Sequence, residues 1–372
     1  MQRELLDNIK KNRIKNCFFQ IMTIDPCLVQ FPAVIFSNDQ TLMKGKYMKS
    51  ISVTIKGQGA PSVMKVSEVD IGAPKEGEVL IRQSVIGVNY MDVYQRSGYY
   101  PMDLPSGIGL EACGIIESIG AGVDYLTEGD RVVYSGGPPG SYANVRNVMA
   151  SRVVRIPEGF KNEQAAAIFL KGTTAEYLLE RAYPIEAGQT VLFHAAAGGV
   201  GLIAGQWGKA IGARMIGVAG GPEKCALAKE HGYAEVIDRK SENVVARVKE
   251  LTGGAGVPVV YDSVGKDTFE QSVECLSPRG YFISFGTTSG SVPPVDASML
   301  QHKGSLYFTR PTLANYCAAR DDLEASAARL FQMIASGAVK TKIGQRYALS
   351  DVVQSHLDLE ASKTSGSTIL LP

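Results

Sequence analysis

The stretch LFHAAAGGVG, Leu192–Gly201, has the residue types and spacing of a turn that binds phosphate. Ala196, Gly198 and Gly201 occupy the three positions of the G-x-G-x-x-G pattern, with alanine in place of the first glycine. The second glycine lets a backbone approach a pyrophosphate, and the third lets the helix pack on the strand. Free N–H groups at the start of that helix attract phosphate. The pattern predicts nucleotide binding; the alternative is a tight turn that binds nothing.

The residues after the next strand indicate which nucleotide binds. An NAD site usually has an acid about 20 residues beyond the turn, which binds the ribose 2′-hydroxyl. Here Gly220 stands there, Lys224 follows within one helical turn, and Arg239 comes after the third strand. Cations without a carboxylate favour a 2′-phosphate. We therefore predict NADPH rather than NADH, and expect Glu223 to face solvent. The alternative is that Lys224 is a solvated helix residue and Arg239 part of a surface salt bridge.

The chain has few groups that could hold a metal. Its cysteines are scattered without a C-x-x-C pair, and its histidines form no H-E-x-x-H motif. A zinc ribbon or a disulfide framework is therefore not expected, and a reducing, cytoplasmic compartment fits. These residues are Cys17, Cys27, Cys113, Cys225, Cys275 and Cys317, with His194, His231, His302 and His356.

Composition excludes some functions. The 372 residues carry 38 basic and 37 acidic side chains, a net charge of +1, which argues against binding nucleic acid through bulk charge. The window Ala187–Gly208 contains no charged residue, but its many glycines favour a strand, a turn and a buried helix over a membrane span.

The elements that must position these residues follow two patterns. From Thr190, strands alternate with helices, which predicts a parallel sheet covered on both faces. Ser241 is the expected N-cap of one of these helices. Between Ile51 and Val145, short strands with glycine-rich turns suggest a partly open barrel. After Leu313 comes one long helix and a terminal strand, STILLP, which we expect to return to the first domain.

Residues 1–49 differ from the rest, and we expect a poorly ordered extension. They show no secretory signal, and their acidic residues are unusual for a transit peptide. A targeting role and a start assigned upstream of Met48 stay open as alternatives.

Eight ordered motifs, covering about residues 50–372, resemble the zeta-crystallin-like quinone oxidoreductases of the medium-chain dehydrogenase/reductase superfamily. They are IGVNYMDVYQRSGYYP, GLEACGII, GDRVVY, FLKGTTAEYLL, FHAAAGGVGL, VVYDSVG, SFGTTSG and LYFTRP. The resemblance implies an α/β protein with a GroES-like, partly open β-barrel catalytic domain (50–173 and 314–372). A Rossmann domain with a doubly wound parallel sheet (174–313) would bind NADPH. The resemblance also implies a homodimeric, zinc-free reductase of quinones.

Zinc-dependent relatives carry a G-H-E motif and a cysteine-rich zinc lobe. Here the matching residues are Gly109, Leu110 and Glu111, and the region after GDRVVY is SGGPPGSYA, without cysteine. We therefore expect no metal.

The resemblance also implies roles for single residues. Asn89, Tyr94 and Tyr100 would line the substrate site, with Tyr94 as a candidate proton donor. Arg239 departs from the tyrosine that relatives often have. The implied cofactor contacts are Asn89, Asp92, Thr174, Tyr177, Gly198, Gly199, Val200, Gly220, Lys224, Arg239, Val264, Phe285, Gly286, Thr287, Phe308, Arg310 and Lys363.

These residues have plainer interpretations. Asn89 could satisfy a turn, and Asp92 could cap a short helix. Tyr94 and Tyr100 could be packing residues, and Lys363 an ordinary exposed lysine.

The expected reaction is hydride transfer from NADPH to a quinone, which is already activated and needs no metal. Three other functions remain open. They are reduction of the C=C bond of an enone or enoyl thioester, an RNA-binding or lens-type structural role, and nucleotide binding without catalysis.

Overall fold

The computed structural model describes residues 48–372, so the predicted disorder of the N-terminal extension lies outside the described residues. Strand β1 (Met48–Ile55) begins within the last residues that we assigned to that extension. Within the described range, no helix has the length and apolar character that crossing a membrane requires. The glycine-rich window forms strand β9 (Thr190–His194), a turn and helix α4 (Gly199–Ile211), as predicted.

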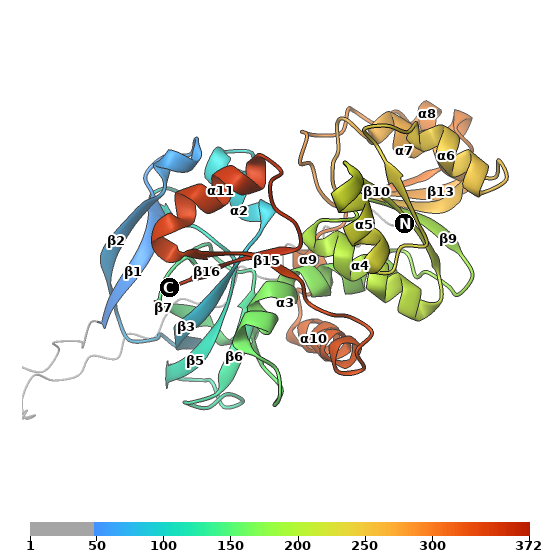
Figure 1. Cartoon of the computed structure of the whole chain (residues 1–372). Coiled ribbons are helices and arrows are strands. Elements are labelled where there is room, and N and C mark those ends of the chain that lie inside the picture. Colours follow the sequence, from blue (N-terminus) through green and yellow to red (C-terminus); the bar gives the residue numbers. More distant parts are fainter. Residues whose placement is uncertain (1–47) are drawn as a thin grey trace, which may run out of the picture. The chain divides into compact units, whose positions relative to one another are not determined.

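The first part of the described chain is β-rich, and two strands from the end of the chain join its larger sheet. A seven-stranded sheet has the order β15-β16-β3-β5-β6-β8, with β7 also paired to β3, and a three-stranded sheet has the order β2-β1-β4. The terminal strand β16 pairs antiparallel with β3 through Thr368 and Val88, so the chain end returns as predicted (Figure 1). The further bounds are β2 (Lys65–Ile71), β3 (Glu78–Val88), β4 (Ser106–Gly107), β5 (Glu111–Ile119), β6 (Arg131–Ser135), β7 (Val145–Met149), β8 (Val153–Arg155), β15 (Ile343–Ala348) and β16 (Ser367–Leu371).

The second sheet is parallel throughout and has the order β11-β10-β9-β12-β13-β14. Its remaining strands are β10 (Arg214–Ala219), β11 (Glu235–Asp238), β12 (Val257–Asp262), β13 (Leu276–Ser284) and β14 (Tyr307–Thr309). The connecting helices are α5 (Pro222–Glu230), α6 (Val244–Leu251), α7 (Phe269–Glu274) and α8 (Ala297–His302).

Side chains that alternate along the central strands face opposite sides of this sheet. Phe193 and Tyr261 belong to the core that includes Trp207 of α4. Leu192 and Val260 belong to the core formed with α6 and α7. Helices therefore cover both faces, which confirms the predicted doubly wound Rossmann sheet beside a GroES-like barrel.

Helix α3 (Asn162–Glu176) packs against strands of the barrel and also against α4. It is buried along most of its length, so it holds its side chains firmly at the place where the two sheets approach each other. The remaining helices are α2 (Tyr90–Ser97), α9 (Leu313–Tyr316), α10 (Arg320–Ala335) and α11 (Val352–Glu360), and a π-helical turn (Tyr177–Ala182) extends α3.

The predicted N-cap of α6 was wrong. The cap is Asn243, whose side-chain oxygen accepts a hydrogen bond of 2.9 Å from the N–H of Ala246. Ser241 instead lies in the turn after β11, where its N–H bonds to the Asp238 carbonyl at 3.0 Å. Two residues of cap type stand close together here, and only the tertiary turn decides which one begins the helix.

Candidate active site

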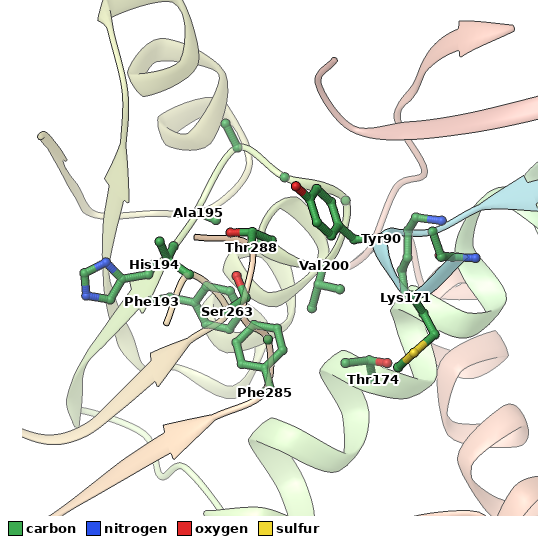
Figure 2. Close-up of a pocket in the computed structure, with 18 of the residues that line it drawn as sticks. Tyr90, Lys171, Thr174, Phe193, His194, Ala195, Val200, Ser263, Phe285 and Thr288 are labelled. Atoms are coloured by element: carbon green, nitrogen blue, oxygen red, sulfur yellow. The ribbon is translucent and has the colours of Figure 1, made fainter. Parts of the chain in front are cut away.

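A cleft of about 1370 Å³ lies between the barrel, helix α3 and the carboxyl ends of the parallel strands (Figure 2). Ligands of doubly wound sheets bind outside these strand ends. Small-molecule pockets usually have about 300–1,000 Å³. The cleft therefore has room for a dinucleotide together with a small substrate.

The turn between β9 and α4 explains its unusual first position. Ala196 is fully buried, and its methyl group lies 2.7 Å from where a Cβ on Gly217 would be. Gly217 in the neighbouring strand has no side chain, and this absence leaves room for the methyl group of Ala196. A Cβ on Gly201 would lie 2.4 Å from the Ala195 carbonyl oxygen, so the helix packs this closely on the turn only with glycine. A Cβ on Gly198 would lie 3.1 Å from the Ala195 carbonyl oxygen, so this position is also tight, and its backbone lines the cleft without a side chain in the way.

Cationic side chains gather at the second strand end. The guanidinium of Arg239 lies over Gly220, with Nε 3.2 Å from the position of an added Cβ. Lys240 approaches Gly221, and Lys224 donates a hydrogen bond of 2.8 Å to the Ser362 carbonyl. We call Lys224, Arg239 and Lys240 the cationic corner.

Burial, followed by the charges of Arg239 and Lys240, lowers the pKa of Lys224 from its ordinary value. Like charges held together in this way favour an anionic ligand. The acid at the tip of β11, Asp238, uses one oxygen to accept hydrogen bonds from the backbone N–H groups of Gly221 at 2.8 Å and Lys240 at 3.0 Å. It therefore shapes the corner. Glu223 is exposed at the rim, as predicted.

A buried polar network lies at the other end of the cleft. Glu111 is fully buried and accepts hydrogen bonds of 2.9 Å from the Asn89 amide and 2.6 Å from the Leu170 N–H. The ammonium of Lys171 lies 3.5 Å from the same carboxylate. Asn89 thus faces the cleft with its amide oriented by Glu111, which goes beyond the turn role of the plainer interpretation.

Asp92 lies behind this network and does not line the cleft. It accepts hydrogen bonds of 2.9 Å from the Asn89 N–H and 2.9 Å from the Tyr142 hydroxyl, which makes it the capping partner at the start of α2. Burial raises its pKa to about 7. For Asp92 the geometry therefore favours the helix-cap interpretation over the cofactor contact.

Tyrosines of α2 and the following loop close the cleft against the parallel sheet. The Tyr94 hydroxyl accepts a hydrogen bond of 2.9 Å from the Thr287 N–H. The Arg310 guanidinium donates to the Tyr100 hydroxyl at 3.3 Å and to the Ser284 carbonyl at 2.8 Å. Because Tyr94 accepts its bond, its own O–H stays available to a substrate.

The structure brings most of the predicted site residues together in this one cleft. Those lining it are Asn89, Tyr94, Tyr100, Thr174, Tyr177, Gly198, Gly199, Val200, Gly220, Lys224, Arg239, Val264, Phe285, Gly286 and Arg310.

Besides Asp92, three predicted contacts lie outside the lining. Phe308 packs into the core of the parallel-sheet domain, stacked on Phe282 at 5.4 Å. Thr287 lies behind Tyr94 and holds its hydroxyl. The Lys363 side chain is 70% exposed and its ammonium lies 3.6 Å from Asp358.

Sequence reasoning missed Lys171 and Lys240, which both line the cleft. Lys171 lies within the motif FLKGTTAEYLL, and Lys240 directly follows Arg239. A lysine within the apolar helical run IFLKGTT, and a second cation directly after Arg239, were the available signals.

His194, Ser272 and Asp262 form a buried hydrogen-bonded chain. Ser272 lies 2.9 Å from His194 Nε2 and donates to Asp262 at 2.8 Å. Figure 2 shows the His194 ring on the side away from Tyr90 and Lys171. Ser272 is fully buried and does not line the cleft, so this hydrogen-bonded triad does not present a nucleophile to a substrate in the cleft. The second Asp262 oxygen accepts from the Val264 N–H at 2.7 Å and so shapes the loop at the strand end.

Leu110, in the position where zinc-dependent relatives have histidine, lines the cleft and is 9% exposed. Among the residues that the structure describes, no three His, Cys, Asp or Glu side chains come together as a metal site.

Comparison with known proteins agrees with this geometry. Residues 75–182 match the family model of the alcohol dehydrogenase GroES-like domain, and residues 199–331 match that of the zinc-binding dehydrogenases. The chain is 48% identical to a quinone oxidoreductase of Pseudomonas aeruginosa over 84% of its own length and 97% of that protein's. It is 35% identical to a 2-haloacrylate reductase of a Burkholderia species, over 87% of this chain and 98% of the relative.

Among solved structures, quinone oxidoreductase of Escherichia coli complexed with NADPH superposes with a TM-score of 0.85 at 45% identity, covering 87% of this chain and all of that one. The chain therefore belongs to the quinone oxidoreductases of the medium-chain dehydrogenase/reductase superfamily.

Proposed function

We propose that this protein is an NADPH-dependent quinone reductase that transfers a hydride from the cofactor to a quinone. The carrying observation is that one cleft joins a glycine turn, the cationic corner and a tyrosine-lined end. The solved relative from Escherichia coli was complexed with NADPH, which supports the choice of cofactor.

The residues present fit this cofactor. The backbone of Gly198 and Gly199, which lines the cleft at the start of α4, suits a pyrophosphate, and the cationic corner suits a 2′-phosphate. When bound, NADPH supplies a hydride from C4 of its nicotinamide. Thr174 of α3 and Phe285 would lie along the nicotinamide half, because both line the cleft and Thr174 follows Lys171 on α3 (Figure 2). Their task is to orient the ring and exclude water.

Tyr94 is our candidate proton donor. A quinone that takes up a hydride needs one further proton to become the hydroquinone. Burial raises the pKa of Tyr94, so its hydroxyl keeps its proton at neutral pH. The Thr287 N–H holds the oxygen in place and leaves the O–H free to donate toward the quinone oxygen. Tyr100, held by Arg310, would flank the same substrate.

The test is a steady-state assay of the purified full-length protein with 1,4-benzoquinone, with either NADPH or NADH as donor. We expect acceptor-dependent oxidation of NADPH and much slower oxidation of NADH. Binding of NADPH without turnover on any acceptor would leave only a nucleotide-binding module and would overturn the proposal.

A second candidate is reduction of an activated C=C bond. It is favoured by the similarity to the 2-haloacrylate reductase. Both reactions use the same hydride donor, so the acceptor decides between them. Turnover of 2-chloroacrylate or a 2-alkenal that exceeds turnover of benzoquinone would favour this candidate.

We further propose that the enzyme works without a metal, as a cytoplasmic homodimer built from the two domains that the sequence suggests. Leu110 in the ligand position supports metal-free chemistry. The unpaired state of the four described cysteines supports a reducing compartment. The family resemblance supports the dimer, which light scattering would test.

A further inference from the structure

Lys171 is a buried lysine without a hydrogen-bond partner. It is 6% exposed, it lines the cleft, and its ammonium makes no hydrogen bond to any described residue. An ammonium carries three N–H donors. Buried donors are nearly always paired, so an exception needs an explanation. The nearest anion is Glu111, 3.5 Å away and already bound by two other donors.

The stem of Lys171 runs over the start of helix α4. A Cβ on Gly199 would lie 2.7 Å from Cδ and 3.0 Å from Cε of Lys171. Glycine at this position therefore makes room for the lysine stem. It also brings the ammonium beside the helix N-terminus, where free N–H groups attract phosphate.

Glu111 fixes the other side of the ammonium. Its carboxylate is rigid, because the Asn89 amide and the Leu170 N–H hold one oxygen each. Asp92 also acts on Lys171 through its charge, but burial raises the pKa of Asp92 to about 7, so that charge is only partial at neutral pH. The pair Glu111–Lys171 thus presents free donors toward the cleft.

We propose that Lys171 binds the cofactor, with its ammonium donating to the phosphate on the nicotinamide side of the pyrophosphate while Glu111 holds the ammonium in place. This inference rests on the proposed function, because it presumes a dinucleotide in the cleft. The cofactor is then held by separate cations: the cationic corner takes the 2′-phosphate, and Lys171 takes the phosphate nearest the reacting ring.

Fragments of the cofactor separate these two contacts. NADPH and 2′-phospho-ADP-ribose both carry the nicotinamide-side phosphate, whereas adenosine 2′,5′-bisphosphate lacks it. The variant Lys171→Met keeps an unbranched apolar stem over Gly199 and removes the donors. Calorimetric titration should show both larger probes binding about tenfold more weakly or worse, and the bisphosphate unchanged within about twofold.

The matched control is Lys224→Met in the cationic corner, which should weaken all three probes. If Lys171→Met alone does not fold, the double variant Glu111→Gln/Lys171→Met removes the charge left unpaired and takes its place in the titration.

Equal weakening of all three probes by Lys171→Met would show that Lys171 acts through the fold, and would overturn the inference. Unchanged binding of NADPH in a folded variant would do the same. If instead the unaltered protein bound none of the three probes, the proposed function itself would fail, so the two failures are distinguishable.

Discussion

We expect two side chains of the cationic corner, Lys224 and Arg239, to determine the preference for NADPH over NADH. Each can be removed by a single substitution. The variants Lys224→Ala and Arg239→Ala each remove one cation from the cationic corner. The binding of NADPH should weaken in both, and the binding of NADH should change little, because NADH has no 2′-phosphate.

The structure sets the size of the effect. The Lys224 ammonium already gives one hydrogen bond to the Ser362 carbonyl, so two of its donors remain for the phosphate. Arg239 is exposed, which reduces its contribution through solvent screening. We expect roughly 1–2 kcal/mol for each cation, which is about 5- to 30-fold in the dissociation constant. The two effects are not expected to add, because both cations would act on one group.

The assay is fluorescence titration of each variant with NADPH and with NADH at low and high salt. Lys229→Ala is the control, because it removes an exposed lysine of the same helix α5 that does not line the cleft. An unchanged NADPH-to-NADH ratio in both variants would refute our assignment of this corner to the 2′-phosphate.

Three further outcomes are expected. Gly201→Ala should lower the unfolding temperature, at a cost of about 1–3 kcal/mol from overpacking, while Gly57→Ala, with nothing within 4 Å, should be nearly neutral by calorimetry. Because the pKa of Asp92 is raised to about 7, its stabilising effect is complete in acid and is lost as pH rises through that value. Asp92→Asn should therefore flatten the fall in stability of at most about 4 kcal/mol between pH values near 4 and 7, and an unaltered urea-unfolding profile would contradict this. Tyr94→Phe should lower kcat by about tenfold or more with a smaller change in KM, whereas full kcat would remove Tyr94 as the proton donor.

The fold was largely predictable because its signals are local. The alternation of strands and helices from Thr190 gave the doubly wound sheet, and the position of Gly201 gave the strand-to-helix turn. The reason why Ala196 can replace a glycine was not predictable. It depends on Gly217 in a neighbouring strand, and only the register of β9 and β10 brings the two together.

The candidate site was predictable where residues stand at strand ends, as Lys224 and Val264 do. The site was less predictable where a residue's role depends on the direction in which its side chain points. Asp92 turns back to its own helix, and Phe308 turns into the core. Lys171 was missed because a lysine in an apolar helix gives no sign, in sequence, of the glutamate and the glycine that surround it.

The central claim is that this cleft carries hydride transfer from NADPH to a quinone without help from a metal. The most direct test is a single-turnover measurement of NADPH oxidation by 1,4-benzoquinone. The protein is first treated exhaustively with a chelator, and the rate is compared between NADPH and NADPH deuterated at the transferred C4 position. The account predicts an undiminished rate after chelation and a primary isotope effect on that rate. Loss of the reaction on chelation with recovery on added zinc, or a rate that deuterium leaves unchanged even when chemistry limits it, would contradict the account.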